Sequence, residues 1–128
     1  DKMTDVETVQ MNLSTGDFKT LSESSIGLTR RNHNLRLYSF IYRTDWLFVE
    51  SLMIKIDGEL FEFDSEQNIR DVASGGYISE RNWYTPSTEF IDALKNSEEV
   101  SYRLIGKDSY IDFDLKKKKL SIISGFFN

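Results

Sequence analysis

Residues 52–63 read LMIKIDGELFEF, and this stretch decides the fold because Asp57-Gly58 joins two short apolar runs within it. Asp-Gly between such runs is typical of a two-residue β-hairpin loop, since both loop positions need a positive φ. The loop sets a register of cross-strand pairs with four apolar side chains on one face: Ile54 with Phe61, and Leu52 with Phe63. A slip of one residue would turn this face outward, so the apolar pattern and the turn predict the same pairing.

A second hairpin is predicted from residues 100–115, VSYRLIGKDSYIDFDL, where apolar and polar residues alternate on both sides of Lys107-Asp108. A two-residue loop there gives these cross-strand pairs: Leu104 with Ile111, Tyr102 with Phe113, Val100 with Leu115 and, on the opposite face, Arg103 with Asp112. Pairs of this kind contribute about 0.2–1 kcal/mol each. The last third of the chain should therefore contain a second antiparallel pair.

Other strand-like segments lie in the first half of the chain, where β-branched and aromatic residues favour strands. We predict the following strands: Asp5–Leu13, Ile26–Arg31, Leu35–Tyr42 and, as the longest, Trp46–Ile56. Turns are expected at Gly16-Asp17 and at Asn32-His33-Asn34, whose residue types tolerate turn geometry. Residues Leu120 to Phe127 should form a final strand or helical turn.

One helix is predicted between the two hairpins. Thr85 has the residue type of an N-cap, and Pro86 suits the first helical position because its missing N–H costs nothing there. Phe90 and Leu94 follow at helical spacing, and the helix should end at Asn96. The predicted fold class is therefore mainly β: an antiparallel β-sandwich or bent sheet with one packed α-helix. An α+β layout, with the helix covering one sheet face, is the alternative.

Composition limits the function classes. The chain has 128 residues, 39% hydrophobic and 29% charged, which suits a single domain over residues 1–128. A net charge of −5 argues against nucleic-acid binding, because phosphate contacts need a basic face. No apolar run approaches the roughly 20 residues that span a bilayer, so no transmembrane segment is expected. The chain begins at Asp1, which we interpret as processing or trimming, so that a leader, and with it a lipid anchor, would precede Asp1.

No residue set matches a catalytic, metal or cofactor pattern. The chain has no cysteine and one histidine, His33, which excludes thiolate chemistry and a two-histidine zinc site. Asp57, Asp64 and Asp71 lack the spacing of a calcium loop, and Gly75-Gly76 lacks the lysine of a phosphate loop. We therefore predict that the protein is not an enzyme and that it binds no metal and no cofactor.

The candidate binding site lies in the irregular stretch from Asp64 to Thr85. Its site residues are of types enriched at protein interfaces: Tyr77, Arg81, Trp83 and Tyr84. The segment that carries them reads either as a strand or as an exposed loop. Its aromatic residues could equally close the core beside the helix start, since aromatic residues in such places usually pack inward.

A second hypothesis is a site for a small anionic ligand. Four arginines follow two adjacent predicted strands, and three of them are the candidate ligand contacts: Arg30, Arg36 and Arg43, with Arg31 as the fourth. A solvated sheet face is the alternative reading, because arginines at a surface commonly serve no more than solubility.

Several segments invite a comparison with known proteins: Met3-Thr4-Asp5, Phe90-Ile91-Asp92-Ala93-Leu94, Val100-Ser101-Tyr102-Arg103 and Ile111-Asp112-Phe113-Asp114-Leu115. In these segments the chain resembles small bacterial exported domains, namely the VasI-like proteins associated with type VI secretion and uncharacterised lipoproteins. It departs from them between Asp64 and Thr85. The resemblance implies a place in the bacterial cell envelope or outside the cell and a non-enzymatic role. We therefore expect a domain that acts by binding a protein partner.

Overall fold

The computed structural model describes residues 8–17, 22–31 and 34–114. Within them the regular structure is mostly strand, in this order: β1 Thr8–Asp17, β2 Ser22–Arg31, β3 Asn34–Arg43, β4 Ser51–Ile56, β5 Glu59–Asp64, β6 Gln67–Val72, the 3₁₀ turn Ser74–Gly76, β7 Ile78–Tyr84, α1 Thr88–Lys95, β8 Val100–Ile105 and β9 Tyr110–Asp114. The predicted class, mainly β with one helix, is confirmed.

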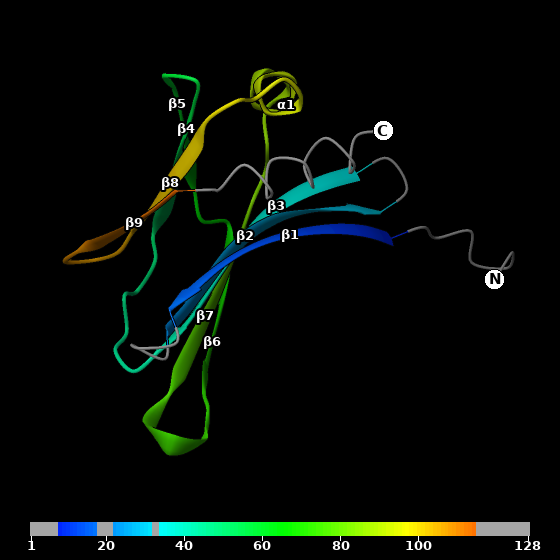
Figure 1. The fold of residues 1–128 in the computed structure, drawn as a ribbon. Coiled ribbons are helices and arrows are strands. Elements are labelled where there is room, and N and C mark those ends of the chain that lie inside the picture. Colours follow the sequence, from blue (N-terminus) through cyan, green and yellow to red (C-terminus); the bar gives the residue numbers. More distant parts are fainter. Residues whose placement is uncertain (1–7, 18–21, 32–33, 115–128) are drawn as a thin grey trace, which may run out of the picture.

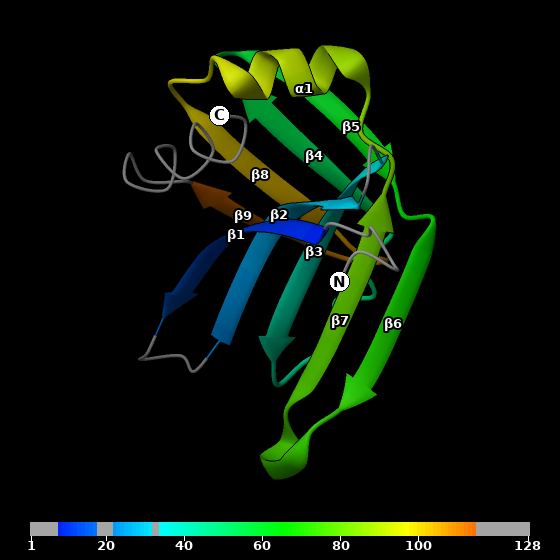
Figure 2. The ribbon, with the colours of Figure 1, turned by 90° about the vertical axis from the view of Figure 1, so that its right-hand side faces the viewer.

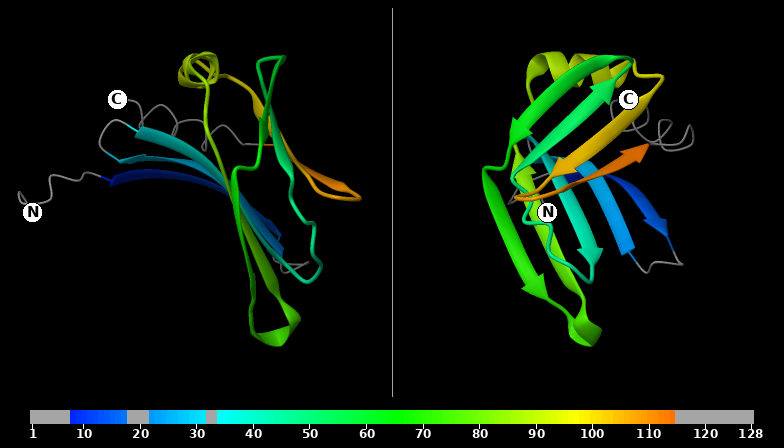
Figure 3. Two further views of the ribbon diagram at one scale, coloured as in Figure 1. Left: turned by 180° about the vertical axis from the view of Figure 1, so that it is seen from behind. Right: turned by 90° about the vertical axis from the view of Figure 1, so that its left-hand side faces the viewer.

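The strands form two antiparallel sheets (Figure 1). The five-stranded sheet has the order β1-β2-β3-β7-β6, and the four-stranded sheet has the order β5-β4-β8-β9. The sheets diverge toward one end of the molecule, where α1 lies between them. The view from behind in Figure 3 shows the same arrangement. The domain is thus an antiparallel sandwich whose open end is closed by the helix.

The core fills the space between the two sheets and α1. Its most deeply buried apolar side chains come from all three: Leu28, Leu37 and Ile41 from the five-stranded sheet, Leu52, Ile54, Ile56 and Leu104 from the four-stranded sheet, and Phe90 from the helix. The ring of Phe90 meets the rings of Phe61 and Phe63 edge-on, with centroid distances of 5.6 and 5.1 Å. Through these rings the helix packs on β5 of the four-stranded sheet, and Phe90 and Leu94 also line a small pocket together with Leu28 and Leu37 of the five-stranded sheet.

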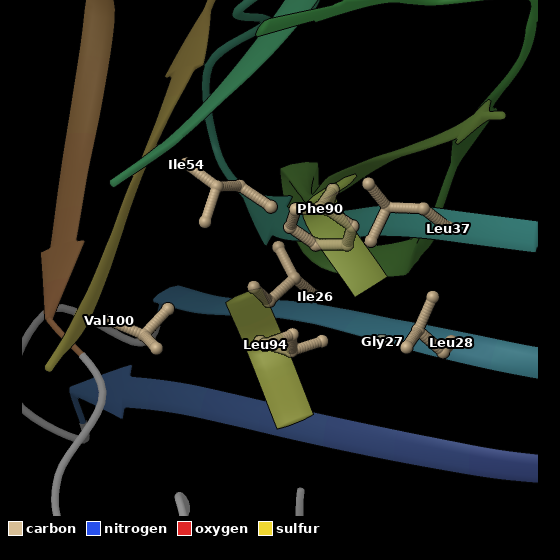
Figure 4. A pocket seen from close by; sticks show the side chains of 8 residues that line it. All are labelled: Ile26, Gly27, Leu28, Leu37, Ile54, Phe90, Leu94 and Val100. Carbon is tan, nitrogen blue, oxygen red and sulfur yellow. The ribbon is translucent and has the colours of Figure 1, made fainter. Parts of the chain in front are cut away.

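A small apolar pocket remains beneath α1. It is lined from both sheets and the helix by Ile26, Gly27, Leu28, Leu37, Ile54, Phe90, Leu94 and Val100 (Figure 4). Its volume is about 10 Å³, whereas even one buried water needs roughly 10–15 Å³ and two or more polar partners. This pocket is a packing gap and offers no space for a small-molecule ligand.

Both predicted hairpins are confirmed in register. In the first, Ile54 pairs with Phe61 and Leu52 with Phe63, and both loop residues have positive φ, 49° at Asp57 and 88° at Gly58. In the second, the predicted pairs that fall on described residues all occur: Leu104 with Ile111, Tyr102 with Phe113 and Arg103 with Asp112. The predicted partner of Val100, Leu115, lies outside the described residues, as do Leu120 to Phe127.

Several predicted boundaries were wrong. Gly16 and Asp17 are not a turn, because the pairing of β1 with β2 continues through both of them. The predicted strand Trp46–Ile56 is strand only from Ser51, since Phe48 has a φ of 57° and breaks the extended chain. The stretch from Asp64 to Thr85 is also more regular than expected, because it contains the paired strands β6 and β7.

The helix begins later than predicted. Ser87, not Thr85, is the N-cap, and its Oγ accepts a hydrogen bond from the Phe90 N–H at 3.2 Å. The Thr85 hydroxyl instead donates to Glu66 Oε1 at 2.9 Å, so it is engaged by the chain before β6. Asn96 ends the helix as predicted.

Candidate functional site

The five-stranded sheet has one face toward the core and one face away from it. Along β7, the buried residues are Ile78, Glu80, Asn82 and Tyr84, so the side chains between them point to the opposite face. Cross-strand partners share a face, and the register pairs Trp83 with Tyr38, Arg81 with Phe40 and Ser79 with Tyr42. Figure 2 shows this face toward the viewer, with the four-stranded sheet behind it.

Aromatic side chains gather on this outer side. We call it the outer aromatic face and define it by Tyr38, Phe40 and Tyr42 of β3, Trp83 of β7, the neighbouring Tyr77, and the arginines Arg36 and Arg81. The rings of Tyr38 and Trp83 lie 5.4 Å apart, and those of Tyr42 and Tyr77 lie 4.9 Å apart in a parallel stack. All of the rings except Tyr38 remain partly accessible to solvent.

The two arginines of the outer aromatic face lie over its rings. The guanidinium carbon of Arg36 is 4.8 Å from the centre of the Trp83 ring, and that of Arg81 is 5.2 Å from the Phe40 ring. Both arginines are exposed, and within the described part of the chain neither makes an ion pair. The face therefore combines ring surface with two arginines that form no ion pair within the described residues. Among the described side chains, its nearest acidic neighbour by register is that of the exposed Asp71 of β6, opposite Ser79.

The structure separates the four predicted site residues. Tyr77, Arg81 and Trp83 lie together on the outer aromatic face, whereas Tyr84 points into the core with no exposed surface. The Tyr84 hydroxyl forms a 2.8 Å hydrogen bond with the Ser39 hydroxyl, and burial raises the pKa of Tyr84 well above its ordinary range. Tyr84 is a core residue and does not contribute to a binding surface.

The candidate anion ligands do not converge. Arg36 lies on the outer aromatic face, whereas Arg30 and Arg43 continue the rows of core residues on β2 and β3 and therefore lie on the opposite side of the sheet. They also lie at opposite ends of the paired strands, since Arg30 is opposite Leu35 and Arg43 is opposite Ile78. The Arg31 side chain and His33 are outside the described part. The three guanidinium groups thus share no pocket.

Glu80 is the most deeply buried charged residue of the described chain, with 1% of its surface exposed. Its carboxylate accepts hydrogen bonds from three consecutive backbone N–H groups, those of Leu47, Phe48 and Val49, at 2.7, 3.1 and 2.9 Å. Arg70 lies 3.5 Å from it on the adjacent strand. Because these groups occupy the carboxylate, Glu80 fixes the β3–β4 connection and is not placed for acid–base chemistry.

Sequence reasoning missed half of the outer aromatic face. Tyr38, Phe40 and Tyr42 recur at every second position of β3, opposite the buried Leu37 and Ile41. That alternation was visible in the sequence. The pairing of β3 with β7, more than 35 residues later, was not visible, and it is this pairing that joins the two aromatic rows.

Comparison of the chain with protein-family models, curated proteins and solved structures found no match. Among the described residues no cluster of three or more His, Cys, Asp and Glu side chains is placed to hold a metal ion. No helix in this part of the chain has the length and apolar character needed to cross a membrane. The candidate site is therefore defined by its geometry alone.

Proposed function

We propose that this chain is a non-enzymatic protein-binding domain and that the outer aromatic face is its contact surface. The observation that carries the proposal is the alignment of aromatic residues from β3 and β7 on the side of the sheet away from the core. Tyrosine, tryptophan and arginine dominate interface hot spots, because they supply large contact area together with directed polar groups. All three residue types meet on this face.

The fold itself does not require aromatic residues there. An antiparallel sheet with one solvated face normally places polar side chains on it. The outer face of the four-stranded sheet carries the charged residues Lys55, Glu62, Arg103 and Asp112 together with two exposed apolar side chains, Leu60 and Tyr110. On the five-stranded sheet, Ile69 of β6 adds apolar surface to the outer aromatic face, since it lies beside Arg81 and is 45% exposed. The outer aromatic face differs from the outer face of the four-stranded sheet in gathering its rings side by side, as Tyr38 with Trp83 and Tyr42 with Tyr77, and this clustering supports a role in binding.

A location in the bacterial envelope or outside the cell is part of this proposal. Its support is the resemblance of the segments around Phe90–Leu94 and Val100–Arg103 to exported bacterial domains. Cell fractionation with an antibody against the domain tests it directly. A signal confined to the cytoplasm would refute this part and leave the binding surface unaffected.

Site-specific crosslinking in the producing cell tests the contact surface. A photoreactive phenylalanine analogue at Ser79 lies on the outer aromatic face, and the same analogue at Lys55 lies on the outer face of the other sheet. We expect a discrete crosslinked product from position 79 that is lost in Trp83→Ala. Equal products from both positions, or a product that persists in a folded Trp83→Ala variant, would overturn the proposal. Circular dichroism confirms that each variant is folded.

A further inference from the structure

Four arginines of the described chain lie over an aromatic ring, and only two of them have a carboxylate partner. Arg70 lies 5.2 Å from the Phe48 ring and beside Glu80. Arg103 lies 3.9 Å from the Tyr110 ring and binds Asp112. The two remaining arginines are those of the outer aromatic face, Arg36 and Arg81, which lack such a partner within the described residues. Within the described residues, the stacked guanidinium groups of Arg70 and Arg103 each contact a carboxylate, and those of Arg36 and Arg81 do not.

The Arg103 site shows how a carboxylate completes such a pair. Arg103 uses the flat side of its guanidinium against Tyr110, and its edge donates from Nε and Nη2 to the two oxygens of Asp112 at 2.6 and 3.0 Å. Stacking leaves the N–H edge of a guanidinium free, and that edge matches a carboxylate in two-point geometry. The same edges of Arg36 and Arg81 are open to a carboxylate from another molecule.

We propose that the outer aromatic face recognises an extended acidic segment of its protein partner, with one carboxylate on Arg36 and a second on Arg81. This inference rests on the proposed function and names the chemistry of the partner. Two positive charges in a chain of net charge −5 select for an acidic occupant, because they form a local exception to the overall field. A long polyanion such as a nucleic acid would also meet the acidic remainder of the surface.

The spacing of the two carboxylates follows from the register. Arg81 pairs with Phe40, which is four residues along β3 from Arg36. At about 3.4 Å per residue, the backbone positions of the two arginines lie roughly 14 Å apart along the strand direction. Both guanidinium groups lean toward the middle of the face, Arg36 over Trp83 and Arg81 toward Tyr38, and the acidic side chains of a bound segment would lean in the same way. An extended segment that runs along the strands would therefore carry its acidic residues four positions apart. The residue midway between them would face the accessible part of the Trp83 ring, which lies on the buried Tyr38, and should be apolar or aromatic.

The probe is a short synthetic peptide with two glutamates four positions apart and a tyrosine midway between them. A control peptide has glutamines in place of the glutamates, and an oligothymidylate represents polyanions. Binding is followed by the fluorescence of Trp83 in a Trp46→Phe background, since the chain has only these two tryptophans. We expect the glutamate peptide to bind about tenfold tighter than the glutamine peptide, as befits charge-assisted hydrogen bonds.

Matched variants assign this preference to the two arginines. In Arg36→Gln/Arg81→Gln the glutamate and glutamine peptides should bind equally. Lys55→Gln/Arg103→Gln removes the same charge from the outer face of the four-stranded sheet and should leave the tenfold preference intact. Equal binding of both peptides to the parent protein, an unchanged preference in the first double variant, or tighter binding of the oligothymidylate would each overturn the inference.

The crosslinking experiment separates this inference from the proposed function. If the product from position 79 depends on Trp83 while the peptides show no glutamate preference, the face binds a protein and the acidic chemistry is wrong. If the product does not depend on Trp83, the proposed function itself has failed.

Discussion

The outer faces of the two sheets differ although their inner faces are alike. Each sheet buries an alternating set of apolar residues in the common core. On the outside of the four-stranded sheet, Arg103 stacks on Tyr110 and forms an ion pair with Asp112 across β8 and β9. On the outer aromatic face of the five-stranded sheet, Arg36 and Arg81 also stack on rings, but within the described residues neither forms an ion pair. Water solvates an exposed charge, so a missing ion pair alone does not mark a site. The distinguishing feature of the outer aromatic face is that its stacked guanidinium groups keep their N–H edges available to another molecule.

The β3–β4 connection links the two sheets and helps to fix their relative position. Leu47 to Val49 are held from the five-stranded sheet by the Glu80 carboxylate. From the four-stranded sheet, the Lys107 N–H donates to the Leu47 carbonyl at 3.3 Å. This segment therefore carries contacts from both sheets, and changes to it should have the largest effects.

Glu80→Ala removes the carboxylate that holds this connection to the five-stranded sheet. The substitution leaves three backbone N–H groups without an acceptor, two of them buried, so we expect a loss of about 3–5 kcal/mol in the free energy of unfolding. Urea denaturation followed by circular dichroism measures it. Arg70→Ala is the control, because it removes only the partly exposed partner of Glu80 and should cost less than about 1 kcal/mol. Equal losses in the two variants would mean that Glu80 acts through its ion pair.

Gly106→Ala tests the same segment from the four-stranded sheet. A Cβ at Gly106 would lie 2.0 Å from the Leu47 carbonyl oxygen, which is backbone and cannot turn aside. We expect a loss of about 2–3 kcal/mol, in the upper part of the range for overpacked sites. Thermal and urea unfolding measure it. Gly76→Ala is a control for the added methyl group, because no atom lies within 4 Å of a Cβ at this position. It is an imperfect control, because the φ of 82° at Gly76 strains any residue other than glycine. A neutral Gly106→Ala variant would show that the β8–β9 loop is not fixed on Leu47.

Trp83→Ala and Tyr110→Ala compare the two outer faces directly. Both residues stack with an arginine, but Trp83 is half-buried and Tyr110 is 58% exposed. We expect Trp83→Ala to cost about 1–2 kcal/mol of stability, less than the truncation of a fully buried tryptophan, and to abolish the crosslink from position 79. Tyr110→Ala should leave that crosslink unchanged and cost under about 1 kcal/mol. Loss of the crosslink in Tyr110→Ala as well as in Trp83→Ala would show that the partner does not distinguish the two outer faces.

The two hairpins could be predicted from the sequence because their information is local. Asp57-Gly58 fixes a loop, and the alternation of apolar residues on either side agrees with it. Strand β6 could not be predicted, because all six of its residues are exposed and carry no apolar period. Its extended form depends on pairing with β7. Phe48 likewise departs from the strand pattern because a carboxylate more than 30 residues away holds its N–H.

The candidate site was predictable only in part, because residue types are local information whereas the pairing of distant strands is not. Residue types alone singled out Tyr77, Arg81 and Trp83, but they could not say which face each side chain would occupy. Tyr84 is next to Trp83 in the chain and points the opposite way once β7 is extended. The contribution of Tyr38 and Phe40 required the long-range pairing of β3 with β7.

The smallest expected effect concerns the charge pair of the four-stranded sheet. The hydrogen bond from Arg103 holds the pKa of the Asp112 carboxyl below its ordinary value. A carboxyl whose pKa is lowered by folding stabilises the protein above its unfolded-state pKa, and that contribution disappears as the pH falls through the folded-state pKa. Arg103→Gln should therefore lower stability slightly at neutral pH and not at all in acid. The difference should also shrink in high salt, since both groups are exposed.

Arg36→Gln is the matched variant on the outer aromatic face. Arg36 has no ion pair to lose within the described residues, so the small stability change should be the same at neutral and acid pH. Urea unfolding of both variants and the parent between neutral pH and pH values below the ordinary carboxyl range gives the two curves. A pH-dependent loss in Arg36→Gln that matches the loss in Arg103→Gln would reveal a carboxylate partner within the chain. The two outer faces would then be electrostatically alike, and the case for an acidic partner would disappear.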